Sequence, residues 1–263
     1  MGTKKKPQVR GRQKVRKALI ITSFLLFPVV FYYLSPILII QGASEGIIVG
    51  SFIVFALLFL FSLLLGRAYC GWVCPAGGMQ EQCFKLRDKR ARGGRLNWIK
   101  YFIWVPWLCA IVIVAVRAGG FSKIDPLYQT YYGISISGIQ SLMIFAIVLL
   151  VIFILAMAAG RRAFCHYGCW MAPFMVVARK LRNVFKWPSL ALEPEEDKCI
   201  DCKKCSKVCP MSLDVNTMVR EAHMENSECI LCGMCVDNCP KGVISYTFKS
   251  GTKAGTGGRG EKR

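Results

Sequence analysis

Four long apolar stretches dominate the first two thirds of the chain. They cover residues 18–40, 46–65, 98–116 and 134–159. A helix needs about 20 apolar residues to cross a bilayer, and prolines inside such a span are tolerated when neighbouring groups satisfy the freed carbonyls. Buried helices of a soluble protein are the alternative, which we disfavour because the first two stretches carry no charged side chain. The pattern therefore predicts four membrane spans.

A short motif recurs directly after the second and the fourth stretch. Arg-Ala-Tyr-Cys-Gly-Trp-Val-Cys occupies residues 67–74, and Arg-Ala-Phe-Cys-His-Tyr-Gly-Cys occupies residues 162–169. Matched positions lie 95 residues apart throughout. A basic amphipathic stretch follows each motif, at 79–90 and 173–186, and the second is typical of a helix at a membrane interface. This repetition predicts an internal duplication of a two-span hairpin.

The positive charge of the chain is concentrated in this apolar part. The formal charge is +20, which alone would be typical of a nucleic-acid-binding protein. Residues 1–192 hold 24 basic and 4 acidic side chains, and most of the basic ones lie in the N-terminal arm and after the second and fourth stretches. Because Lys and Arg mark the cytoplasmic ends of spans, the charge is a topology signal. We expect a multi-pass protein of the cytoplasmic (inner) membrane, with both termini in the cytoplasm, in contact with lipid and not with nucleic acid.

Two four-cysteine runs follow in a short acidic segment. The first contains Cys199, Cys202, Cys205 and Cys209, the second contains Cys229, Cys232, Cys235 and Cys239, and a proline follows each run. This C-x2-C-x2-C-x3-C-P spacing is that of bacterial two-cluster ferredoxins, in which the fourth cysteine ligates the other cluster. We therefore predict one [4Fe–4S] cluster on Cys199, Cys202, Cys205 and Cys239, and another on Cys229, Cys232, Cys235 and Cys209.

The alternatives for these eight cysteines are weaker. Zinc sites usually use two C-x2-C pairs instead of four-cysteine runs, and disulfides are disfavoured on the cytoplasmic side. A short helix is expected at 213–222 and a closing strand at 242–246. A domain of this size has little hydrophobic core, so we expect the clusters to hold it together.

The two C-x3-C motifs form a second candidate site. Its members, called here the paired cysteines, are Cys70, Cys74, Cys165 and Cys169. If the two halves meet at one depth, four thiolates come together, which suits a third iron–sulfur cluster with Arg67 and Arg162 offsetting its negative charge. A redox-active thiol pair, a zinc site and simple packing stay open as alternatives.

Other residues receive milder interpretations. Cys83 and Cys109 are expected to pack as small apolar side chains. His166 suits either a proton carrier, a metal ligand or an interfacial polar residue, and Glu81 is expected to lie solvated at a helix start. Four aromatic side chains beside the motifs suit either a quinone ring or an interfacial belt. They are Tyr69, Trp72, Tyr167 and Trp170.

On these motifs the chain resembles the NapH/MauN group of membrane ferredoxin-type proteins, which is also related to the membrane part of NosR. The resemblance covers roughly residues 18–245, and Cys-Gly-Trp-Val-Cys-Pro at 70–75 is similar to the family element. The second element departs from it, because Trp170 follows Cys169 and the proline comes only at Pro173. The resemblance implies quinol oxidation, or electron transfer between a quinone pool and a soluble redox partner.

Together these features predict a polytopic α-helical membrane protein with a C-terminal α+β two-cluster ferredoxin domain. The expected divisions are a basic cytoplasmic arm at 1–17, a four-span domain at 18–190, the ferredoxin domain at 191–248 and a disordered basic tail at 249–263. The predicted function is electron transfer between the quinone/quinol pool and a redox protein, as in a quinol dehydrogenase. An assembly factor for a respiratory metalloenzyme and a membrane anchor that relays electrons are the alternatives.

Overall fold

The computed structural model describes residues 11–250, and the predicted ends of the arm and tail, at 1–10 and 251–263, lie outside them. The part before the ferredoxin domain contains α1 Gly11–Leu25, α2 Phe27–Val30, η1 Tyr32–Leu34, α3 Pro36–Ser44, β1 Ile47–Val49, α4 Gly50–Leu65, α5 Ala68–Trp72, α6 Pro75–Cys83, η2 Gly94–Trp98, α7 Ile99–Arg117, β2 Lys123–Asp125, α8 Ile139–Ala159, α9 Ala163–Tyr167 and α10 Ala172–Phe185. The ferredoxin domain contains β3 Pro188–Pro194, η3 Glu196–Lys198, α11 Lys204–Lys207, α12 Val215–Arg220, α13 Met234–Asn238 and β4 Ile244–Ser250.

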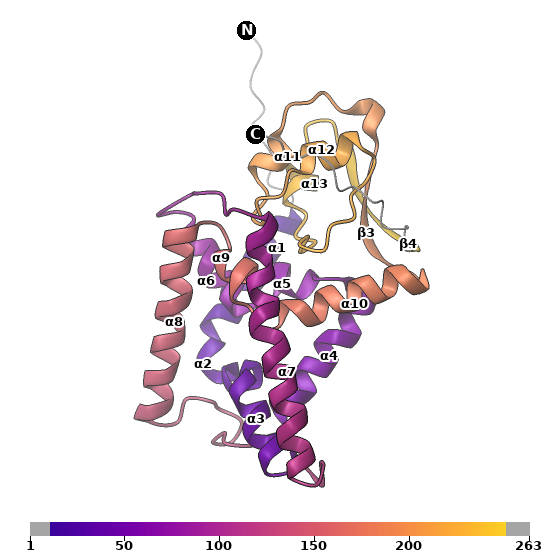
Figure 1. Ribbon diagram of the computed structural model, residues 1–263. Coiled ribbons are helices and arrows are strands. Elements are labelled where there is room, and N and C mark those ends of the chain that lie inside the picture. Colours follow the sequence, from indigo (N-terminus) through magenta and orange to yellow (C-terminus); the bar gives the residue numbers. More distant parts are fainter. Residues whose placement is uncertain (1–10, 251–263) are drawn as a thin grey trace.

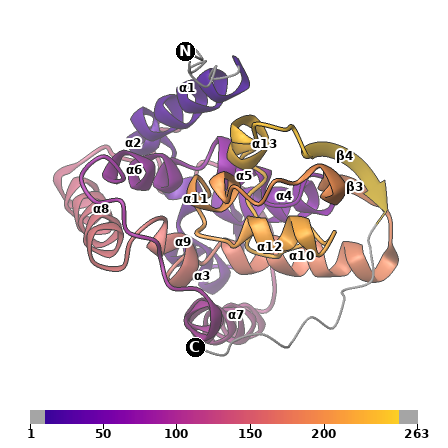
Figure 2. The ribbon, with the colours of Figure 1, turned by 90° about the horizontal axis from the view of Figure 1, so that it is seen from above.

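The long helices and the ferredoxin domain occupy different ends of the molecule. In Figure 1, α7 and α8 run lengthwise through the lower part, whereas α11, α12, α13, β3 and β4 gather above it. The short helices α5, α6 and α9 and the crosswise α10 lie where the two parts meet, and Figure 2 shows the ferredoxin domain lying over α4, α5 and α10. The short motif helices therefore lie between the apolar helices and the ferredoxin domain.

Two helices among the described residues are long and apolar enough to cross a membrane. They are Gly94–Arg117 and Ile139–Ala159, and Gly50–Leu65 is a shorter apolar helix. The third and fourth predicted spans thus appear as long helices. The second is shortened because its first residues form β1, which pairs in parallel with β2.

The stretch predicted as the first span is not one continuous helix. It divides into the end of α1, α2, η1 and α3. Pro28 cannot donate a backbone hydrogen bond to the preceding turn, and Ser35 is extended (φ −84°, ψ 123°) before Pro36, as expected of a residue before proline. The stretch 18–40 is therefore not the single continuous span that the hydropathy pattern predicts, because the helix is interrupted near both prolines.

Side chains from distant elements satisfy the backbone at this interruption. The buried Ser135 hydroxyl donates to the Val29 carbonyl at 2.6 Å and accepts from the Tyr32 amide at 2.9 Å. The indoles of Trp170 and Trp107 donate to the carbonyls of Leu34 and Pro36, each at 3.0 Å. Irregular backbone is tolerated in an apolar setting only where such partners exist, so the break is a built feature of the fold.

The ferredoxin domain is closed by an antiparallel ribbon. β3 pairs with β4 from Pro188↔Ser250 to Pro194↔Ile244. The ribbon therefore begins before the predicted boundary at 191 and includes the first two residues of the predicted tail. α12 lies within the predicted helix at 213–222, and β4 continues the predicted strand at 242–246.

Candidate functional site

The two C-x3-C motifs adopt the same local structure. Each begins with a five-residue helix, α5 or α9, that carries the first cysteine. The amide of Cys74 bonds the Tyr69 carbonyl at 3.0 Å, and the amide of Cys169 bonds the Phe164 carbonyl at 2.9 Å. The two bonds are equivalent, because donor and acceptor in the second motif lie 95 residues after those in the first. The tight turn brings each second cysteine back toward the first.

All four paired cysteines lie in the interior of the protein. Cys70, Cys74, Cys165 and Cys169 are each at most 4% exposed, and they share one hydrophobic cluster. Burial, together with the nearby thiols of Cys165 and Cys70, raises the pKa of Cys169 to about 12. The side chains come from both halves, so the structure brings the two motifs together.

One carboxylate binds two buried arginines beside these cysteines. Glu81 accepts from Arg16 at 2.9–3.0 Å and from Arg162 at 2.6 Å. Burial would raise the pKa of Glu81, but Arg162 and Arg16 hold it below its usual value. Arg162 also donates to the Cys70 carbonyl at 2.6 Å. The expectation of a solvated Glu81 at a helix start is wrong, because Glu81 lies near the end of α6 and is covered by α1 and by Arg162 of the second motif.

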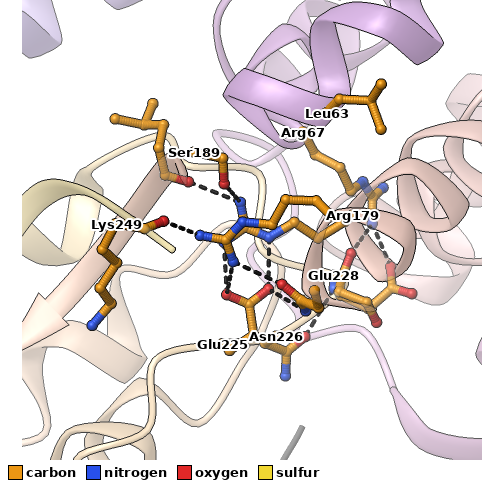
Figure 3. A network of polar contacts seen from close by, with 12 residues as sticks. Leu63, Arg67, Arg179, Ser189, Glu225, Asn226, Glu228 and Lys249 are labelled. Atoms are coloured by element: carbon orange, nitrogen blue, oxygen red, sulfur yellow. Dashed lines mark hydrogen bonds and ion pairs between the residues drawn. The ribbon is translucent and has the colours of Figure 1, made fainter. Parts of the chain in front are cut away.

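A second carboxylate binds the other motif arginine. Glu228 accepts from Arg67 at 2.7 Å, drawn in Figure 3, and from Lys100 at 2.5 Å. Burial would raise the pKa of Glu228, but the two cations lower it to about 2. Because Glu228 belongs to the ferredoxin domain, this contact joins that domain to α7 and to the first motif.

Buried cations outnumber the carboxylates that serve them. Arg16, Arg67, Lys100 and Arg162 are at most 2% exposed, and across residues 11–250 they form ion pairs with two carboxylates, Glu81 and Glu228. Unpaired buried charge costs several kcal/mol. Nitrogens of Arg67 (Nε, Nη2) and Arg162 (Nε) also lack hydrogen-bond partners in the described part.

This surplus of positive charge fits an anionic group held by the paired cysteines. A thiolate-ligated iron–sulfur cluster is anionic, and its potential depends on nearby charge and burial. Among residues 11–250, no three or more Cys, His, Asp or Glu side chains are grouped to hold a single metal ion. A [4Fe–4S] cluster instead takes its thiolates at separate corners. The four buried thiols of the paired cysteines, with an excess of buried positive charge beside them, therefore fit such a cluster.

The ferredoxin cysteines divide between two environments. Cys209 lies with Cys229, Cys232 and Cys235 around one pocket, whose other walls include Leu192 and Met211. Cys202 is exposed, whereas Cys205 is buried and Cys199 and Cys239 are half-buried. The fourth cysteine of the first run thus lies beside the second run, which is the exchange that the spacing predicts.

Left-handed residues shape both cysteine loops. Asp201 and Lys203 in the first run, and Leu231 and Gly233 in the second, have φ between 49° and 72°. Asp201 corresponds to Leu231 and Lys203 corresponds to Gly233, and the members of each pair lie 30 residues apart in the sequence. Such turns reverse the backbone between successive cysteines, which lets three thiols of one run face a common centre.

The second run packs directly on the first C-x3-C motif. A Cβ placed on Gly71 would overlap the Ile230 carbonyl oxygen and lie 3.4 Å from the Cys232 Cβ. The Trp72 indole donates to the Leu231 carbonyl at 3.1 Å, and the Gln13 amide donates to the Cys232 carbonyl at 3.0 Å. Glycine at 71 therefore permits a close approach between the two candidate centres.

The remaining candidates lie in different surroundings. His166 is buried, with Nδ1 2.9 Å from Asn97 Oδ1, and burial lowers its pKa to about 4. Tyr167 donates to the Arg92 carbonyl. Cys83 is buried, as expected of a packing residue, whereas Cys109 is exposed on α7. Sequence reasoning assigned no site role to Arg16, Lys100 or Glu228. Acidic residues are scarce before residue 193, and this scarcity was a signal that Glu81 pairs with a buried cation.

Comparison with known proteins supports iron–sulfur binding at both places. A family described as a 4Fe-4S binding domain matches residues 47–93 and again 141–188. A family described as a 4Fe-4S dicluster domain matches residues 195–244. The first family covers both C-x3-C motifs, and the second covers both four-cysteine runs. No solved structure matches the chain.

Relatives extend this similarity over most of the chain. An uncharacterized protein of Methanocaldococcus jannaschii is 26% identical over 87% of this chain and 89% of its own length. The methylamine utilization ferredoxin-type protein MauN of Methylobacillus flagellatus is 26% identical over 70% of this chain and 66% of its own length. The ferredoxin-type protein NapH of Escherichia coli is 22% identical over 84% of this chain and 77% of its own length. The chain is thus similar to the NapH/MauN ferredoxin-type proteins over most of its length.

Proposed function

We propose that this chain is a membrane-bound iron–sulfur protein that exchanges electrons between the quinone/quinol pool and a redox protein. One observation carries the proposal. The paired cysteines are buried among apolar helices, and the second ferredoxin run packs on them through Gly71 and Cys232. A membrane-side centre and a ferredoxin domain in direct contact form a short route between lipid and the aqueous phase.

The proposed cofactors are two [4Fe–4S] clusters in the ferredoxin domain and a third at the paired cysteines. One ferredoxin cluster is assigned to Cys199, Cys202, Cys205 and Cys239, and the other to Cys209, Cys229, Cys232 and Cys235. Such clusters supply one-electron chemistry when bound. The common pocket of Cys209 and the second run supports the second assignment, and the buried arginines support the third cluster.

The proposed topology has four spans and two duplicated halves. Its third and fourth spans are α7 and α8, its second is α4, and its first is the interrupted stretch from α1 to α3. Matched hydrogen bonds at Cys74 and Cys169 support the duplication. The basic loops support a cytoplasmic location for both termini and the ferredoxin domain, and in that arrangement the most exposed ferredoxin cysteine, Cys202, faces the redox partner.

Electron paramagnetic resonance tests the quinol assignment. Oxidised protein, purified in detergent, is mixed with a short-chain ubiquinol or menaquinol, and the spectrum of reduced clusters is followed. We expect reduction by one of these quinols. Clusters that respond to dithionite but to neither quinol would instead indicate a relay for another protein donor.

Iron and sulfide analysis tests the third cluster. The variant in which serine replaces Cys70, Cys74, Cys165 and Cys169 is expected to lose about four of twelve iron atoms, as three [4Fe–4S] clusters require. A variant with Cys83 and Cys109 changed to serine is the control and should keep its full iron. Equal iron contents in the two variants would refute the third cluster.

A further inference from the structure

A well-formed apolar cavity lies beside Cys74. Its volume is about 260 Å³, and its walls come from α2, η1, α3, α6, α8 and α9, from the loop at Gln129 and from the residues next to the two motifs. Cys74 ends the first motif and Pro75 follows it, whereas Phe164 belongs to the second motif and Trp170 follows that motif. The cavity therefore reaches one of the paired cysteines from the side of the apolar helices.

The interruption of the first apolar stretch forms part of the cavity wall. Ser35 and Pro36, at the break between η1 and α3, both line it. The Trp170 indole holds one wall in place by its hydrogen bond to the Leu34 carbonyl, so the cavity does not depend on a mobile side chain.

The walls select for a neutral ligand that contains a ring. None of the lining residues is charged, and the wall includes the aromatic rings of Phe27, Phe31, Phe164 and Trp170. A few polar groups accompany them, on Tyr32, Ser35, Gln41 and Gln129. Ligand sites are usually apolar pockets of about 300–1,000 Å³ with a few polar groups that fix orientation. A volume near the lower limit suits a single headgroup.

The position of the cavity gives a route from the membrane. Ile144, Val148 and Ile152 of α8 form part of its wall, and α8 is one of the two helices long enough to span a bilayer. Ile144, which lines the cavity, is 48% exposed, so the wall is open to the surroundings of the helix there. A ligand with an apolar tail can therefore leave the tail in lipid while its head lies beside Cys74.

We propose that this cavity binds the ring headgroup of a lipid-soluble quinone. The inference rests on the proposed function and adds the location of the site and the residues that form it. Aromatic walls, absence of charge among the lining residues and contact with Cys74 favour a ring-bearing redox carrier over the acyl chain of a phospholipid, which needs neither the rings nor the cysteine.

A binding experiment with a bulky substitution at the cavity wall tests this location. Full-length protein in detergent is titrated with decylubiquinone by calorimetry. Ile144→Trp adds bulk at the wall, and Ile147→Trp adds the same bulk on α8 at a position that is 60% exposed and does not line the cavity. We expect Ile144→Trp to weaken binding at least about tenfold, which is about 1.4 kcal/mol, and Ile147→Trp to leave it unchanged. Val148→Trp, on the same wall, should repeat the loss.

The controls separate this proposal from the function on which it rests. Iron content and the thermal midpoint show whether each variant is folded and loaded. Unchanged quinone affinity in both Ile144→Trp and Val148→Trp would overturn the location, as would a bound phospholipid that decylubiquinone does not displace. If quinol still reduces the wild-type clusters in that case, the proposed function stands and only the site is wrong.

Discussion

Replacing Glu81 by glutamine removes the carboxylate that serves two buried cations. Arg16 is 2% exposed and Arg162 is fully buried, and both contact Glu81 within 3.0 Å. Removing one partner of a buried ion pair costs about 3–5 kcal/mol, because the remaining charge is left uncompensated. For a chain of this size each kcal/mol lowers the melting temperature by about 2–4 °C. We therefore expect the midpoint of Glu81→Gln to fall by about 6–20 °C.

Thermal unfolding of detergent-purified protein measures this shift. The scan rate is kept the same for all variants, because the midpoint depends on it when unfolding is irreversible. Glu45→Gln is the control, since Glu45 is exposed and its bond with the Tyr128 hydroxyl lies at the surface. Its effect should stay within about 0.5 kcal/mol. Adding Arg16→Met to Glu81→Gln should recover part of the loss. Equal, small shifts in Glu81→Gln and Glu45→Gln would refute the reasoning.

Three further predictions concern the ferredoxin domain and its contact with the membrane part. Cys209→Ser should remove the same paramagnetic signal as serine substitutions in the second run, and Cys239→Ser the same signal as those in the first. The reverse pattern would contradict the crossed assignment. Gly71→Ala should destabilise the contact by about 1–3 kcal/mol through overpacking, seen as faster proteolytic release of the ferredoxin domain, whereas Gly93→Ala, where an added Cβ meets no atom closer than 3.8 Å, should not. Burial would raise the pKa of Glu225, but Arg179 lowers it, so this pair stabilises the fold above the usual pKa of about 4.3 and loses its effect as the pH falls below it. The difference in melting temperature between wild type and Glu225→Gln should therefore shrink between pH 7 and pH 4, and a constant difference would contradict this.

The sequence predicted those features that depend on local spacing. The eight ferredoxin cysteines, the short helix between their runs and the closing strand follow from a motif whose geometry is contained in a few residues. The amphipathic stretch at 173–186 likewise appears as α10. The 95-residue offset anticipated the matching hydrogen bonds of Cys74 and Cys169.

Features that depend on tertiary contacts could not be predicted in this way. Hydropathy alone did not show that the stretch 18–40 is interrupted, because the break is stabilised by Ser135, Trp107 and Trp170 from distant parts of the chain. Nor could spacing pair Glu228 with Arg67, which are 161 residues apart. The break in this stretch and the Glu228–Arg67 ion pair both lie near the paired cysteines, and the break lines the cavity.

The most direct test of the account compares quinol-driven reduction in wild-type protein and in the variant with serine at all four paired cysteines. Iron analysis first establishes that the variant keeps its two ferredoxin clusters. The account predicts that quinol reduces the ferredoxin clusters of the wild type, whereas those of the variant respond to dithionite alone. Reduction of both proteins by quinol at the same rate would contradict a role for the paired cysteines in electron transfer.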